Sequence, residues 1–155
     1  MNLMVDKILS FDVSSVSTGW SWITDGKLES FGVLRSLKEY TLQTKLFWFG
    51  KQVKCLVDIY DPDIVLVEDT YLKNVKTLKT LVQFVGTAQF VCYPRTLEIV
   101  NVNTVRSHFK VKTKEEAFDY VKNKYKRKLK HLTFEEGNDI TDSILQALYW
   151  LEKEK

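Results

Sequence analysis

The sequence has few of the residues that mark secreted, membrane-spanning or zinc-binding proteins. It contains only two cysteines, Cys55 and Cys92, which lie far apart in apolar surroundings, and only two histidines that could join them. This indicates buried thiols rather than a zinc site. No apolar run approaches the roughly 20 residues that span a bilayer, and the opening residues MNLMVDKILSF lack the form of a signal peptide. We therefore expect a cytoplasmic protein.

The chain also lacks repeats and low-complexity linkers that would divide it into parts. Its 155 residues suit one domain with a substantial core, and we expect a single domain over residues 1–155. Hydrophobic residues make up 45% of the sequence and aromatic residues 13%, which excludes a disordered chain.

Positive charge is concentrated in one segment. The net charge is only +3, but residues 110–130 contain nine lysines and arginines against three acids. The densest part is KNKYKRKLK, residues 122–130. Two interpretations remain open for this segment: a solvated helix face, or a surface that contacts a polyanion.

The order of predicted elements indicates an α/β protein. Residue alternation predicts a first strand that ends near Asp12, followed by strands over residues 17–24 and 27–34 that are joined by the tight turn Asp25-Gly26. The remaining pattern predicts helices over residues 38–60, 75–93, 103–109 with Asn103 as cap, and 113–125 capped by Thr113. It also predicts strands over residues 64–68 and 96–102, and a last helix that begins with residues 138–150. We expect a five-stranded mixed sheet, antiparallel in its first three strands and then parallel, with helices on both faces.

Four acids fall where such a sheet would bring them together. Asp12 ends the first strand and Glu68 ends the fourth. The carboxyl ends of neighbouring strands are where ligands gather in open α/β sheets. Asp139 and Asp142 stand three positions apart in NDITDSILQALYW, on a different side of the helix from the apolar set Ile140, Ile144, Ala147, Leu148 and Leu151 and on the same side as Gln146.

A cluster of four carboxylates is tolerable mainly around cations, because the charges repel one another. Oxygen ligands without histidine or thiolate indicate Mg²⁺ or Mn²⁺, and two such ions about 3.5–4 Å apart would clamp a phosphodiester for hydrolysis. Each acid also has a plainer explanation. Asp12 could be a turn residue, Glu68 an edge charge, and Asp139 with Asp142 a helix N-cap.

With these residues in place, the chain resembles the RuvC-type Holliday-junction resolvases of the ribonuclease H-like fold, most of all the small versions carried by phages. The family's first strand reads roughly I-x-x-[IF]-D-P-G-S-x-x-T-G, and ILSFDVSSVSTGW matches it at Asp12, Ser15, Thr18 and Gly19, with Val13-Ser14 in place of Pro-Gly. VEDTYLKN resembles the second motif and NDITDSILQAL the third.

The resemblance implies a homodimeric endonuclease that resolves branched DNA with two Mg²⁺ ions per site, for which Mn²⁺ is a plausible substitute, and leaves 5′-phosphates. It implies that Asp12, Glu68, Asp139 and Asp142 bind the metal, and that Tyr71 stacks on bases at the branch point; Tyr71 has the alternative role of packing on the sheet. The expected DNA-binding residues are Tyr71, Lys73, Asn74, Arg106, Lys112, Lys114, Lys122, Lys124, Lys126 and Arg127. The compartment would be the cytoplasm of a bacterial host if the chain is phage-encoded.

Three alternatives stay open at this point. The chain could be a non-catalytic nucleic-acid-binding module that kept the fold, although all four acids are present. It could be an actin-like or sugar-kinase-like ATPase, whose first phosphate loop FDVSSVSTGW also resembles, although 155 residues leave no room for a second domain. It could also be a related ribonuclease H-like nuclease that cuts flaps, forks or RNA–DNA hybrids.

Overall fold

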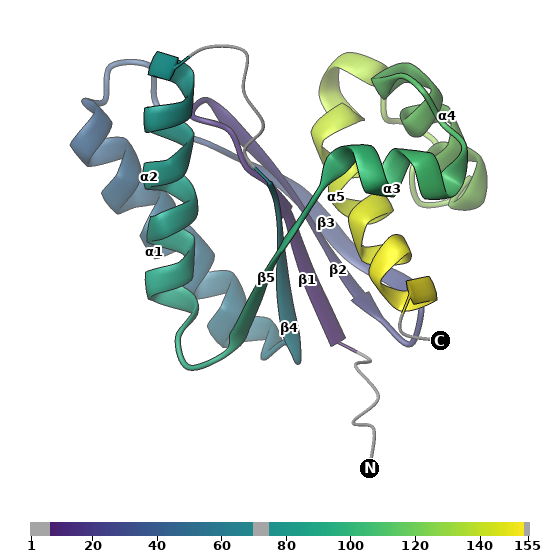
Figure 1. Ribbon diagram of the computed structural model, residues 1–155, viewed down its shortest axis with the longest axis horizontal. Helices are drawn as coiled ribbons and strands as arrows, with labels where there is room; N and C mark the ends of the chain where they lie inside the picture. The colour runs from purple at the N-terminus through teal and green to yellow at the C-terminus, as the bar shows by residue number, and fades with distance from the viewer. Residues whose placement is uncertain (1–6, 70–74, 154–155) are drawn as a thin grey trace.

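A five-stranded mixed sheet forms the centre of the molecule (Figure 1). The computed structural model describes residues 7–69 and 75–153. The strands lie in the order β3-β2-β1-β4-β5, with bounds Lys7–Asp12 (β1), Ser17–Thr24 (β2), Lys27–Arg35 (β3), Ile64–Glu68 (β4) and Thr96–Val100 (β5). The first three strands pair antiparallel, whereas β4 pairs parallel with both β1 and β5. The predicted mixed sheet is confirmed.

The turn between β2 and β3 follows from its two residues. Asp25 and Gly26 both adopt positive φ, 51° and 73°. Two successive positive φ values are the requirement of the tight hairpin turn whose twist matches that of the flanking strands, and Asp-Gly is a favoured pair for it. The sequence-based prediction of this hairpin is confirmed.

Helices cover both faces of the sheet, as predicted (Figure 1). The helices α1 (Leu42–Tyr60) and α2 (Val75–Cys92) pack together on one face. The other face carries α5 (Phe134–Lys153), against which α3 (Val102–Phe109) and α4 (Lys114–Lys124) pack. Within the described ranges, no helix is long and apolar enough to cross a membrane.

Two predicted helix starts are wrong, for the same reason. The helix α1 begins at Leu42 rather than residue 38, because the Thr41 side chain caps it by accepting from the backbone N–H of Thr44. The cap of α3 is Asn101 rather than Asn103, because the Asn101 side chain accepts from the backbone N–H groups of Asn103 and Thr104. As a result β5 ends at Val100 instead of residue 102. Polar residues near helix starts compete for the cap, and local pattern alone does not choose between them.

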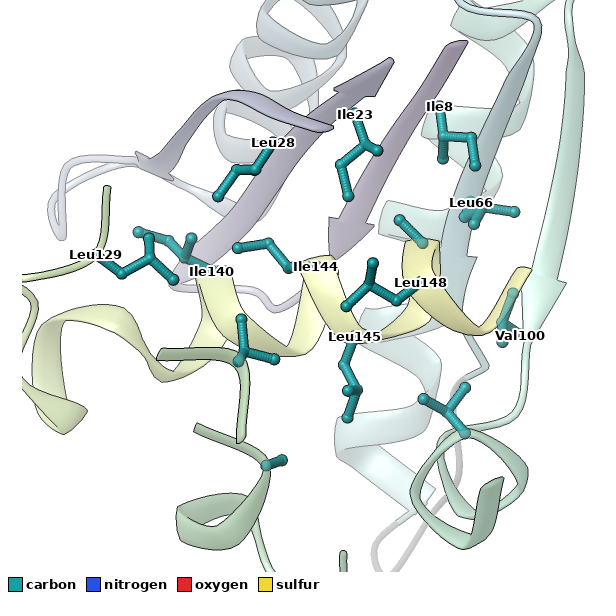
Figure 2. Packing of buried hydrophobic residues seen from close by; sticks show 14 of the residues in the cluster. Ile8, Ile23, Leu28, Leu66, Val100, Leu129, Ile140, Ile144, Leu145 and Leu148 are labelled. Atoms are coloured by element: carbon teal, nitrogen blue, oxygen red, sulfur yellow. The ribbon is translucent and has the colours of Figure 1, made fainter. Parts of the chain in front are cut away.

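The central strand β4 is buried on both faces and divides the core in two. Ile64 and Leu66 pack toward α5, whereas Val65 and Val67 pack toward α1 and α2. Figure 2 shows the α5 side, where Ile144 and Leu148 lie against Ile8, Ile23 and Leu28 of the strands. Side chains alternate along a strand, so a continuously apolar strand requires cover on both sides.

Only one of the two cysteines is buried. Cys92 lies in the core, and burial raises the pKa of its thiol to about 11. Cys55 is exposed, so the prediction of two buried thiols is wrong. Cys55 falls two residues after the buried Val53 of α1, and at 100° per residue it points away from the core side of the helix.

Candidate active site

Two strand ends set the position of the first two acids. Asp12 is the last residue of β1 and Glu68 the last residue of β4. These strands are adjacent and parallel, with Phe11 opposite Val67. The pairing therefore brings both carboxyl-terminal ends to the same edge of the sheet, as predicted.

The helix α5 supplies the other two acids, but neither of them caps it. It begins at Phe134, after Thr133, whose hydroxyl accepts from the backbone N–H of Glu136 and whose carbonyl accepts from that of Gly137. Asp139 therefore lies in the second turn, so the predicted helix start at residue 138 is wrong and the alternative explanation of Asp139 as an N-cap is excluded. Neither aspartate is needed to cap the helix, and both face β1 and β2.

A glycine lets α5 approach β2 closely enough to deliver Asp139. A Cβ atom at Gly19 would lie 2.2 Å from the carbonyl carbon of Asp139. Gly19 pairs with Asp12 across β1 and β2, so this close approach occurs beside the first acid. Ser17 of the same strand donates a hydrogen bond from Oγ to Oδ2 of Asp139 at 3.0 Å. Gly19 thus allows α5 to pack directly on β2, and the Ser17 hydrogen bond holds Asp139 there.

Polar contacts fix the helix against β1 as well. Gln146, one turn after Asp142, donates from Nε2 to the Phe11 carbonyl at 2.7 Å and to Ser10 Oγ at 3.0 Å. Asp142 and Gln146 are both buried, although the helical wheel set them apart from the buried side. The wheel missed this burial because α5 is enclosed by the sheet, α3 and α4 together. The sequence analysis did not predict the roles of Ser17 and Gln146. Gln146 could have been found from its spacing, because it stands four residues after Asp142 and therefore on the same side of the helix.

The acids are close enough to perturb one another. Burial raises the pKa of Asp12 well above its usual value, and the charge of Glu68 and a side-chain hydrogen bond with it raise it further. Burial also raises the pKa of Asp142 to about 6, and the Glu68 charge adds to this despite opposing contributions from Lys114 and Arg106. Such shifts are typical of acids grouped at a functional site.

Lys114 lies where three of the acids meet. Its Nζ is 3.0 Å from Asp139 Oδ1, 3.3 Å from Asp142 Oδ2 and 3.8 Å from Asp12 Oδ2. Burial alone would lower the pKa of Lys114, but the charges of Asp12, Asp142 and Asp139 raise it above its usual value. Lys114 is the first residue of α4, which begins there because Thr113 caps the helix as predicted.

Arg106 approaches the site from α3. Its guanidinium lies 4.0 Å from Asp142 Oδ2, and its Nε is buried without a hydrogen-bond partner within the described ranges. A small hollow beside it is lined by Glu68, Asp142 and Gln146. Arg106 and Lys114, two of the expected DNA-binding residues, therefore both reach the acids.

The donor set suits a hard divalent cation. Its ligand atoms are carboxylate oxygens, and the Lys114 ammonium shows that the three aspartates can share one positive charge. In the part of the chain that the structure describes, no three His, Cys, Asp or Glu side chains are arranged to hold a metal ion as they stand. Asp12, Asp139 and Asp142 are instead spaced around the Lys114 ammonium.

The other predicted DNA-binding residues separate into groups. Lys112 is exposed, two residues before Lys114. Lys122, Lys124, Lys126 and Arg127 lie at and beyond the far end of α4, away from the acids. Tyr71, Lys73 and Asn74 lie outside the described residues.

A mixed sheet in this strand order, with acids at the ends of β1 and β4 and on a helix packed across them, defines a ribonuclease H-like fold. No protein-family model matches the sequence. The crossover junction endodeoxyribonuclease RuvC of Dictyoglomus thermophilum is 23% identical over 154 residues, covering 96% of this chain and 98% of that protein.

Solved structures of Holliday-junction resolvases have a similar fold. Thermus thermophilus RuvC in complex with Holliday junction substrate superimposes with a TM-score of 0.77 at 12% identity, covering 93% of this chain and 94% of that one. The fowlpox virus resolvase in complex with Holliday junction DNA gives 0.62 at 18% identity, covering 96% and 98%. The chain therefore shares the fold of these resolvases, and its sequence is similar to that of a RuvC protein along nearly its whole length.

Proposed function

We propose that this chain resolves four-way DNA junctions with a centre formed by Asp12, Glu68, Asp139 and Asp142. The chain is a metal-dependent endodeoxyribonuclease of the crossover-junction type. The observation that carries the assignment of the centre is the grouping of Asp12, Asp139 and Asp142 around one cationic group, with Glu68 beside Asp12. Its compartment is the cytoplasm, that of a bacterial host if the chain is phage-encoded.

The proposed ion is Mg²⁺, two per site, with Mn²⁺ as a substitute. Bound there, it would supply Lewis-acid stabilisation and a nucleophile at neutral pH. The four carboxylates would hold it, and Arg106 and Lys114 would hold the scissile phosphate. Water adds to the phosphorus while the bond to the 3′ oxygen breaks, which leaves a 3′-hydroxyl and a 5′-phosphate.

Recognition would rest on phosphates and on the shape of the branch. Lys112 and Lys114 would contact the backbone close to the cut, without reading bases. Tyr71, by resemblance, would stack on an unpaired base at the branch point, with Lys73 and Asn74 beside it. Affinity should therefore fall with salt, with a slope of about −0.9 for each phosphate contact.

A homodimer is part of the proposal. One chain carries one set of four acids, so paired symmetric cuts across a four-way junction require two copies. The outer surface of α1 and α2 suits a second copy: a groove of about 860 Å³ between them is lined by Phe47, Ile59, Phe90 and Tyr93. Phe90 is 82% exposed and Tyr93 81% exposed. Exposed apolar grooves of this kind mark protein contacts.

The proposed function is tested with a panel of labelled substrates in Mg²⁺ or Mn²⁺. Four-way, three-way and flap DNA and an RNA–DNA hybrid are compared at equal concentration. We expect the four-way junction to be cut fastest, in symmetric pairs that end in 5′-phosphates. Faster cutting of the hybrid or the flap would assign the chain to another ribonuclease H-like activity, and binding without cutting of any substrate would make it a non-catalytic module.

A further inference from the structure

The end of α4 and the turns after it are strongly basic, and they are attached to the β2–β3 hairpin. Residues 122–130 contain six lysines and arginines and no acid. Tyr125 donates from its hydroxyl to the Gly26 carbonyl at 3.4 Å, and Lys128 donates from Nζ to the Leu28 carbonyl. Leu129 is fully buried in the same cluster as Leu28 (Figure 2). Residues 125–130 are therefore held in place although they belong to no helix or strand.

These anchors leave four cations pointing to solvent. Lys124, Lys126, Arg127 and Lys130 are exposed, and none of them has an ion-pair partner within the described residues. We call these four residues the distal basic surface. The other lysines of the segment are already bonded: Lys122 donates to the Leu132 carbonyl at 2.7 Å.

Two hollows flank this surface. One, of about 520 Å³, lies between the hairpin and residues 123–128. The other, of about 420 Å³, is lined by Lys122, Lys126 and Lys130. Each hollow has a single acid in its lining, Glu29 in the first and Asp119 in the second. The hollows together present a concave, positively charged surface.

The distal basic surface is well separated from the acids. The helix α4 begins at Lys114, which contacts the acids, and ends at Lys124. Eleven helical residues span about 16 Å, which corresponds to about five base pairs of duplex. Glu115, Glu116 and Asp119 are exposed along α4 between the two ends. An acidic stretch therefore separates the two basic regions, and they cannot share a phosphate.

We propose that the distal basic surface binds the phosphate backbone of a duplex arm about half a helical turn from the scissile phosphate. This inference rests on the proposed function. Figure 1 shows α4 and the turns after it on the opposite side of the sheet from α1 and α2. In a dimer formed through α1 and α2, the two distal basic surfaces face outward, where the arms leave the branch point.

A duplex fits this surface better than a protein partner does. Protein interfaces have an apolar or aromatic centre. Here the aromatic ring of Tyr125 is turned to the hairpin, and Leu129 belongs to the core. What remains for a partner is charge, and attraction between charges supplies most of the affinity of proteins for a nucleic-acid backbone.

The test uses hairpin-capped four-way junctions with arms of about 5 or about 20 base pairs, the shorter set by the α4 span. The variant Lys126→Ser/Arg127→Ser is compared with Lys7→Ser/Lys153→Ser, which removes the same charge at residues outside the distal basic surface. Kd is measured in metal-free buffer at several salt concentrations, and a linear duplex of the longer length is included. Equal thermal midpoints confirm that all proteins are folded.

The wild type should bind long arms more tightly than short ones, and the distal variant should lose that gain. Its salt slope on long arms should fall by about 0.9 for each contact removed, and the control pair should keep the wild-type slope. An unchanged Kd and slope for the distal variant would overturn the proposal and favour an acidic protein as partner. An equal loss on short and long arms would also overturn it. If the wild type does not prefer junctions over the duplex but the distal variant loses duplex affinity, the proposed function fails and the distal contact stands.

Discussion

At the scale of single residues, Lys114 is the group on which the site depends most. It contacts three aspartates that come from β1 and α5, and two of these acids are almost fully buried. The sequence indicated Lys114 only as one of several DNA-binding residues. Its contacts with the three aspartates join residues far apart in the sequence, so no pattern within residues 110–130 could predict them.

Replacing Lys114 by Met should destabilise the metal-free protein and increase its response to metal. The three aspartates would lose their shared counter-charge. We expect a loss of about 1–2 kcal/mol in the free energy of unfolding, less than for a buried pair because 37% of the Lys114 side chain is exposed. Thermal unfolding with and without Mg²⁺ measures both effects. Lys112→Met is the matched control, and equal behaviour of the two variants would contradict this role.

Because the pKa of Asp142 is raised, the free energy of unfolding should depend on pH. The folded protein holds the Asp142 proton up to a pKa of about 6, whereas the unfolded chain releases it near 3.8. Stability that is present below pH 3.8 is therefore lost as the pH rises through about 6. In metal-free buffer, Asp142→Asn should become more stable than the wild type over this interval, by up to about 3 kcal/mol.

Denaturant unfolding at a series of pH values measures that difference. The exposed Asp119→Asn variant on α4 serves as control. A stability difference between Asp142→Asn and the wild type that stays constant from pH 4 to pH 7 would show that Asp142 titrates normally.

At the scale of elements, the position of α5 on the sheet decides whether the acids meet. The strands and the Asp25-Gly26 turn could be predicted because alternation and turn chemistry are local properties. The start of α5 could not, since Asp139 and Asp142 have the spacing of a weak capping box and Thr133, the actual cap, stands six residues earlier. The close packing of α5 on Gly19 depends on a contact between residues 120 positions apart, which no local pattern predicts.

Gly19→Ala should displace α5 and disable the site. The added methyl would lie 2.2 Å from backbone atoms of Asp139, which cannot move aside as a flexible side chain does. We expect a loss of at least about 3 kcal/mol in stability and loss of metal-induced stabilisation. Gly86→Ala in α2 is the control: no atom lies within 4 Å of the added Cβ, so this variant should gain up to about 1 kcal/mol. Equal stabilities for the two variants would contradict the claim that α5 packs closely on Gly19.

At the scale of the whole molecule, the two faces of the sheet have different tasks. One face carries α5 with α3 and α4 and forms the acidic site, and the other carries α1 and α2 with their exposed apolar groove. The strand order and the family resemblance made the first face predictable. The groove was not predicted, because Phe47, Phe90 and Tyr93 read from sequence alone as ordinary apolar helix positions.

If the chain forms the proposed dimer through α1 and α2, Phe90→Glu should convert that dimer to monomers. A charge at the most exposed apolar residue of the groove would be buried against the second copy without a partner. Light scattering over a range of concentrations measures the mass, with Val82→Glu as a control on α2 outside the groove lining. A wild-type chain that stays monomeric throughout, or a Phe90→Glu chain that stays dimeric, would refute this interface.

The most direct test of the central claim is the cleavage rate of a labelled four-way junction in Mg²⁺ by the wild type and by Asp12→Asn. Asp12 ends β1 beside the other acids, and its amide replacement keeps the side-chain shape while removing the charge that we propose binds the metal. We predict junction binding close to that of the wild type and cleavage slower by at least about a thousandfold. Asp25→Asn in the hairpin turn should cut normally. Undiminished cleavage by Asp12→Asn would contradict the assignment of the site.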